Sequence, residues 1–113
     1  NKMDIVLDKL KDKKKNIKVF FISVDPERDS PEIIKDYLSN FDNIFNGITG
    51  QPEKIFLLYK SWGVMSKKIF LENGEYNIDH SSPVILLKNG KYVSVISHRD
   101  DIKESLKIIK KYL

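Results

Sequence analysis

The spacing of hydrophobic residues changes along the chain, and each spacing predicts a different element. The first apolar stripe has the i, i+3, i+4, i+7 spacing of a helix and consists of Met3, Val6, Leu7 and Leu10. We expect this helix to run into a lysine-rich stretch and to stop near Asn16. Residues 17–24, IKVFFISV, are almost all β-branched or aromatic, which is typical of a central strand covered on both faces in a parallel sheet.

Two further helices are predicted from the residues that can begin them. Ser30 can cap a helix in which Pro31 occupies the first turn and Glu32 complements the helix dipole. The buried side of this helix is expected to contain Ile34, Leu38 and Phe41. Another helix begins at Pro52, and the apolar stripe that we expect in the core is Ile55, Leu58, Tyr59 and Trp62.

The second half of the chain predicts hairpins and a closing helix. Asn73-Gly74 and Asn89-Gly90 favour two-residue turns between strands, which we expect at about 67–71, 76–79, 83–88 and 91–96. Asp101 and Glu104 have the spacing of a capping box at the start of the last helix. This order of elements predicts an α/β protein with a mixed sheet flanked by helices, and a thioredoxin-like fold is the leading candidate.

Composition narrows the class of protein without identifying its chemistry. The 113 residues are enough for one domain, 1–113, and the 41% hydrophobic and 32% charged residues are typical of a globular protein. The net charge of +4 comes mainly from lysines near predicted helix ends. These lysines lack interleaved aromatic residues, so no nucleic-acid partner is expected. The chain has no cysteine, which excludes a thiolate metal site or a thiol catalyst made from these residues alone.

Two short segments carry the candidate chemistry. Asp25 follows the long strand at its carboxyl end, where open α/β sheets usually bind ligands, and DPERDS continues from it. Without a ligand, the same segment is an acidic turn in which Arg28 pairs with a carboxylate. His80 is either a metal or proton-transfer group or an imidazole held by Asp79 or a backbone carbonyl. The residues alone leave both interpretations open.

Three segments resemble the SCO/SenC family of copper chaperones. They are FFISVDPERDSPE at 20–32, NGITGQPEKI at 46–55 and DHSSPVILLKNGKYV at 79–93. VDPERD is very specific for the family, and DHSS between a hairpin and a strand supports the match. The resemblance runs through essentially the whole chain in order, and it implies a thioredoxin-like domain held at a membrane.

The resemblance also implies a cargo and a site. The family delivers copper to the binuclear copper centre of cytochrome c oxidase subunit II, and another copper chaperone or a thiol reductant is a further expected partner. Its copper ligands are two cysteines spaced Cys-x-x-x-Cys and one histidine, which matches His80. Thiolates favour Cu(I), and imidazole also suits Cu(II). Asp79 would then orient or tune the ligand, and Asp25, Arg28 and Asp29 would structure the loop near the metal.

The chain lacks two features of the family pattern, a cysteine pair and a strand, and their absence leads to further expectations. The family's cysteine pair lies shortly before the first helix, and a strand that belongs in the middle of the sheet has no counterpart here. We therefore expect either a piece truncated at its N-terminus or a strand-swapped homo-oligomer, with two inner strand edges unpaired and no tight copper binding. By resemblance, the location is the periplasmic side of a bacterial inner membrane or the mitochondrial inner membrane facing the intermembrane space.

Two other functions remain open. A thiol-disulfide oxidoreductase or peroxidase on the same fold needs a reactive cysteine, which these residues do not contain. A non-catalytic interaction domain needs only that His80 packs. On the copper-chaperone interpretation we expect no enzymatic activity.

Overall fold

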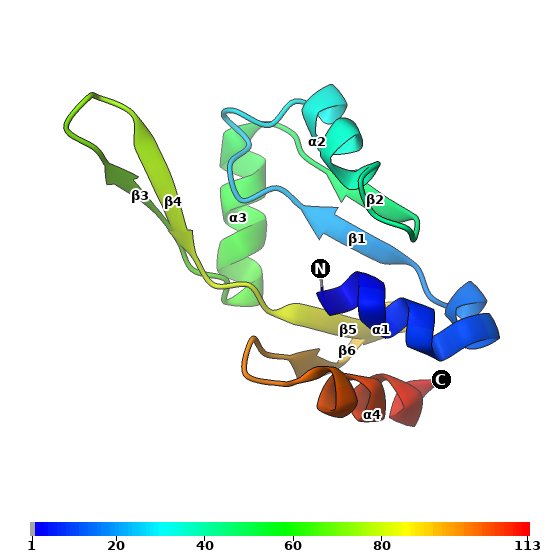
Figure 1. Ribbon diagram of the computed structural model, residues 1–113. Helices are drawn as coiled ribbons and strands as arrows, with labels where there is room; N and C mark the ends of the chain where they lie inside the picture. The colour runs from blue at the N-terminus through cyan, green and yellow to red at the C-terminus, as the bar shows by residue number, and fades with distance from the viewer. Residues whose placement is uncertain (1) are drawn as a thin grey trace. The chain divides into compact units, whose positions relative to one another are not determined.

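The computed structural model describes residues 2–113 and groups them into two compact units (Figure 1). The first unit runs through Val19 and also contains residues 41–44 and 82–113. The second contains residues 20–40 and 45–81. That the two units belong to one domain stays a prediction of the sequence. Among the described residues, no helix is long and apolar enough to cross a membrane.

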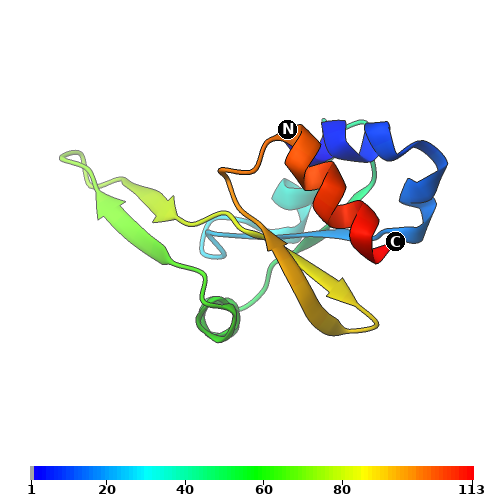
Figure 2. The ribbon, with the colours of Figure 1, turned by 90° about the horizontal axis from the view of Figure 1, so that it is seen from below.

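The first unit is built from two α-helices, a 3-10 helix and a hairpin. Helix α1 (Lys2–Leu10) is followed by the 3-10 helix η1 (Lys11–Asn16), so helical structure ends at Asn16 as predicted, but the α-helix itself already ends at Leu10. Strands β5 (Val84–Lys88) and β6 (Lys91–Ile96) pair in antiparallel fashion, and helix α4 (Ile102–Tyr112) follows. Figures 1 and 2 both show α1 beside α4. The buried side chains of this unit include Val6, Leu7, Leu10, Ile96, Ser105 and Ile109.

Polar contacts complete the first unit. The carboxylate of Asp4 accepts hydrogen bonds from the backbone N–H groups of Asp42 and Asn43, each at 3.0 Å. The hydrogen bond from the Asn43 side chain is the main reason that the pKa of Asp4 is lowered from 3.8. The predicted capping box is confirmed, because Asp101 accepts from the N–H of Glu104 while the Glu104 carboxylate accepts from the N–H of Asp101.

The second unit begins at Phe20, the second residue of a strand–helix–strand arrangement. Strand β1 (Val19–Ile22) pairs with β2 (Phe45–Ile48), and their arrows point the same way in Figure 1. The intervening helix α2 (Pro31–Leu38) begins as predicted, because the Ser30 hydroxyl accepts from the N–H of Ile33. Ile34 and Leu38 are buried and α2 packs on β2, whereas Phe41 lies beyond the end of the helix and is half-buried.

A third helix and a long hairpin complete the second unit. Helix α3 (Pro52–Trp62) ends at Gly63, whose left-handed φ of 69° is strained for residues with a side chain. Strands β3 (Ser66–Phe70) and β4 (Tyr76–His80) form an antiparallel hairpin closed by the predicted Asn73-Gly74 turn. Both ribbon views show this hairpin extending away from α3 as an arm (Figures 1 and 2).

Two expectations about burial are wrong. Trp62 was expected in the core, but it lies in the last turn of α3 and is 39% exposed. Phe20 was expected to be covered, but it is 56% exposed. The strands of residues 2–113 form three pairs, β1–β2, β3–β4 and β5–β6, rather than one continuous sheet. This pairing agrees with the prediction that inner strand edges have no neighbour, since β1 pairs only with β2 among the described strands.

Candidate functional site

The loop at residues 23–29 connects the end of β1 to α2, and its first residue organises it. Ser23 is fully buried, and its hydroxyl accepts from the N–H of Asp25 at 3.0 Å and donates to the Asp29 carboxylate at 2.6 Å. The carbonyl of Asp25 accepts from the N–H groups of Arg28 and Asp29, which closes a tight turn. The Thr49 hydroxyl donates to the Asp29 carbonyl at 2.8 Å. The loop therefore has a fixed shape, set by hydrogen bonds at both of its ends.

Asp25 is the buried acid of this loop, and two side chains satisfy its carboxylate. Only 6% of the residue is exposed. One carboxylate oxygen accepts from Arg28 Nε, and the other accepts from the Tyr76 hydroxyl at 3.0 Å. A buried carboxylate is costly unless it is paired and hydrogen-bonded, so these two partners explain how Asp25 stays in place.

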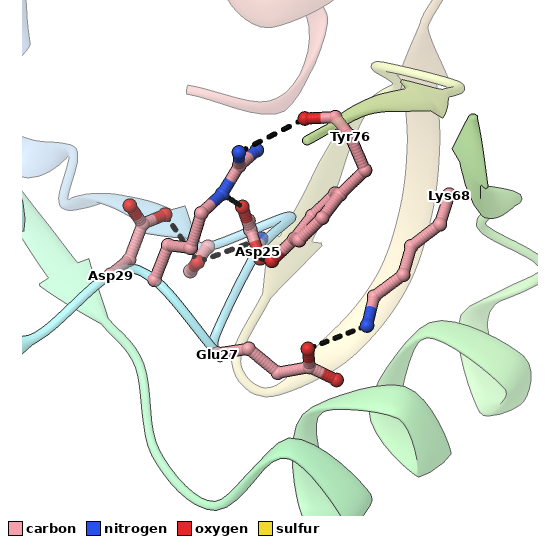
Figure 3. A network of polar contacts seen from close by, with 7 residues as sticks. Asp25, Glu27, Asp29, Lys68 and Tyr76 are labelled. Atoms are coloured by element: carbon pink, nitrogen blue, oxygen red, sulfur yellow. Dashed lines mark hydrogen bonds and ion pairs between the residues drawn. The ribbon is translucent and has the colours of Figure 1, made fainter. Parts of the chain in front are cut away.

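The loop contacts the hairpin at Tyr76, the first residue of β4 (Figure 3). The Arg28 guanidinium lies 4.0 Å from the centre of the Tyr76 ring, and Arg28 Nη1 donates to the Tyr76 carbonyl at 3.0 Å. Lys68 lies 4.8 Å from the same ring and donates to the Glu27 carboxylate at 2.5 Å. The loop therefore contacts both strands of the hairpin.

These contacts change the acid–base properties of the side chains involved. The hydrogen bond to Asp25 is the main cause of the raised pKa of Arg28. The hydrogen bond to Glu27 raises the pKa of Lys68. Burial, followed by the hydrogen bond to Asp25, raises the pKa of the Tyr76 phenol. Arg28, Lys68 and Tyr76 therefore keep their protons across the neutral pH range.

His80 lies at the other end of β4 and is exposed. Its Nδ1 lies 3.0 Å from the carbonyl oxygen of Ser81. A protonated Nδ1 donates to this carbonyl, and that tautomer has its lone pair on Nε2, the usual arrangement for a metal-binding imidazole. The base of the hairpin is closed next to it, because Ser81 N–H donates to the Met65 carbonyl and the Ser81 hydroxyl accepts from Met65 N–H.

The structure brings some predicted site residues together and separates others. Asp25, Arg28 and Asp29 share one network, as expected for a structured loop. Asp79 and His80 are successive residues of β4, so their side chains point to opposite faces of the hairpin. The carbonyl of Ser81, rather than the carboxylate of Asp79, is placed to orient the imidazole.

Sequence reasoning missed Tyr76 and Ser23. Tyr76 precedes His80 by four residues on a predicted strand, so alternation alone places the two on one face, but nothing in the sequence links Tyr76 to Asp25. Ser23 lies within an apolar run and carries no motif of its own.

Among residues 2–113, no three His, Cys, Asp or Glu side chains gather in a way that could hold a metal ion. His80 alone does not make a copper site.

Comparison with known proteins places this chain in a family. Residues 1–113 match the SCO1/SenC family model. An SCO2-like protein of Rickettsia prowazekii is 34% identical over 113 residues, covering 97% of this chain and 55% of that protein. The chain thus spans about half the length of the curated relatives that it matches over most of its length.

Solved structures give the same result. Copper-bound ScoI of Bradyrhizobium japonicum has a TM-score of 0.85 and 34% identity, covering 99% of this chain and 72% of that chain. Copper-bound ScoI of Arabidopsis thaliana has a TM-score of 0.89 and 29% identity, covering 98% of this chain and 70% of that one. These likenesses confirm the predicted α/β, thioredoxin-like fold. The chain therefore belongs to the SCO1/SenC family.

Proposed function

We propose that this chain is the histidine-bearing part of a copper-delivery protein that assists assembly of the copper centre of cytochrome c oxidase subunit II. The observation that carries the proposal is the family match over residues 1–113 together with copper-bound relatives that cover nearly the whole chain. Copper is the cargo, and His80 is the ligand that these residues contribute.

The donor set explains why the chain needs further residues to hold copper. An imidazole alone is a weak site, whereas two thiolates and an imidazole suit copper in both oxidation states. The 113 residues contain no cysteine. We propose that the two thiolates come from a Cys-x-x-x-Cys segment outside them, or from a second chain in a strand-swapped assembly. A second copper chaperone or a thiol reductant would load or reduce this site.

The proposed location follows from the same family. The Arabidopsis thaliana relative named SCO1 homolog 1 is mitochondrial and is 34% identical over 87 residues. We propose a membrane-facing compartment, either the bacterial periplasm or the mitochondrial intermembrane space, because the copper centre of an oxidase is assembled there. We also propose that the protein acts without enzymatic turnover.

A copper titration tests the proposal. The complete protein that contains these residues, its His80→Ala variant and the 113-residue chain alone would be titrated while thiolate–copper absorption and bound metal are followed. His98→Ala is the matched control, because His98 is the only other histidine of the chain and is also exposed. We expect one copper in the complete protein and in His98→Ala, far weaker binding in His80→Ala, and hardly any in the short chain.

Three results would contradict the proposal. If His80→Ala binds copper like the parent, His80 is structural and not a ligand. Stoichiometric, high-affinity copper in a stable monomer of the 113 residues would show that the outside thiolates are not needed. Thiol-disulfide activity of the complete protein with no copper requirement would favour the oxidoreductase interpretation instead.

A further inference from the structure

We infer that Asp25, Arg28 and Tyr76 are positioning residues for His80: they form a clamp that fixes the β3–β4 hairpin and thereby the direction in which the imidazole points. The inference rests on the proposed function, because it assigns a role toward the same copper ligand. Both carboxylate oxygens of Asp25 already accept hydrogen bonds, from Arg28 and from Tyr76.

The hairpin register shows that the clamp and the imidazole act on one face. Opposite residues of an antiparallel pair project to the same side, and this side changes with every residue. Tyr76 pairs with Phe70, Lys68 pairs with Ile78, and His80 pairs with Ser66. Tyr76, Lys68 and His80 therefore belong to the same face, and the 23–29 loop holds that face through the first two. Loss of the contacts between the 23–29 loop and this face would reorient the face that carries His80.

The clamp and the ligand lie at opposite ends of β4. Four residues separate Tyr76 from His80, which is about 13 Å along a strand at about 3.3 Å per residue. At the His80 end, the hairpin is closed by the Ser81–Met65 hydrogen bonds. At the other end, it is held by the contacts of Tyr76 and Lys68. Two fixed ends define an orientation, whereas the base alone permits the hairpin to swing or twist.

The hairpin depends on such a clamp because it has little support of its own. A two-stranded hairpin is at best marginally stable by itself. Ile69, Phe70 and Leu71 near its turn are 42%, 71% and 41% exposed, so they contribute little burial. By contrast, three contacts converge on Tyr76: its hydroxyl on buried Asp25, its ring under Arg28 and its carbonyl on Arg28. The clamp therefore supplies specific polar contacts at the end of the hairpin where little apolar surface is buried.

Metal ligation is sensitive to such an orientation. Ligand distances in protein metal sites hold within about 0.2 Å, and substitution of groups that orient a ligand typically lowers affinity by about 10- to 100-fold. If the hairpin twists, the strand that carries the Cα–Cβ bond of His80 changes direction, even though the residue is still present. Loss of the clamp is thus expected to weaken copper binding without removing a ligand.

The test uses the complete protein and four variants, one of which is His80→Ala. Tyr76→Phe removes one hydroxyl and keeps the ring. Arg28→Lys keeps the charge but loses the planar fork, and it serves as the second variant if Tyr76→Phe does not fold. Tyr92→Phe is the matched control, because Tyr92 is 60% exposed and lies on strand β6 in the first unit. The readouts are copper affinity by competition, the Cu(II) electron paramagnetic resonance spectrum and amide hydrogen exchange of residues 76–80 without metal.

We expect Tyr76→Phe to lower copper affinity by about 10-fold or more, to alter the Cu(II) spectrum and to speed exchange in β4, with Tyr92→Phe unchanged in all three. Parent-like affinity and spectrum in Tyr76→Phe, alongside weak binding in His80→Ala, would overturn the positioning role and leave the ligand in place. Parent-like binding in His80→Ala would instead overturn the ligand proposal on which this role rests.

Discussion

Replacing Ser23 by alanine is a direct test of how the 23–29 loop is held. The substitution removes two hydrogen bonds from a site with no solvent exposure. The bond to the Asp29 carboxylate is charge-assisted and contributes about 1.5–3 kcal/mol, and an unsatisfied buried N–H of Asp25 costs about 1–3 kcal/mol. Asp29 is half-buried, so water can replace part of the first contribution. We therefore expect the free energy of unfolding to fall by about 2–3 kcal/mol.

Urea unfolding of the complete protein, followed by circular dichroism, measures this loss. Ser61→Ala is the matched control: the Ser61 hydroxyl is exposed and donates to the Leu58 carbonyl within α3, so its loss should change stability by less than about 0.5 kcal/mol. A double-mutant cycle with Asp29→Ala should show a coupling of about 1–2 kcal/mol between Ser23 and Asp29. A loss below about 0.5 kcal/mol in Ser23→Ala, or no coupling in the cycle, would refute the assigned role of the hydroxyl.

Two further substitutions test packing and buried polarity in the second unit. A Cβ at Gly47 would clash with Ile34 Cγ2 and lie 3.2 Å from Leu38 Cδ1, so Gly47→Ala should lower the free energy of unfolding by about 1–3 kcal/mol in urea denaturation. The Tyr59 hydroxyl is buried and has no hydrogen-bond partner in the described residues, and burial raises its pKa to about 12 from 10.0. The unfolded chain thus ionises first, so stability should fall as pH rises from 10 toward 12, and Tyr59→Phe should flatten that fall without loss of stability at neutral pH.

Local signals in the sequence predicted the elements well because each signal depends on nearby residues. Ser30 with Pro31, and Asp101 with Glu104, begin helices at the predicted positions. The two Asn-Gly pairs close both hairpins, and the strand bounds differ from those predicted by one residue at most in these hairpins. A cap or a turn is decided within four residues, so one sequence is enough to place it.

Burial and the site network were harder to predict because they depend on residues far apart in the chain. An apolar stripe shows that Trp62 could be buried but not which element would cover it, and the last turn of α3 leaves it half-exposed. The Asp25–Tyr76 hydrogen bond joins residues 51 positions apart. Arg28 pairs with a carboxylate of its own loop, as the sequence predicted, yet the partner of this loop on β4 had no signal that a single sequence could supply.

The 23–29 loop holds the hairpin while β4 carries the exposed His80, and this arrangement suits the proposed delivery of a metal. A copper ligand that passes its cargo to another protein must be reachable, and His80 is exposed at the end of β4. An exposed side chain on a thin hairpin would lose its direction unless other contacts hold the backbone. Those contacts come from buried Asp25, whose carboxylate accepts hydrogen bonds from Arg28 and from Tyr76 at the start of β4. His80 can thus be exposed at one end of β4 while the strand stays ordered, because the stabilising charges lie at the other end.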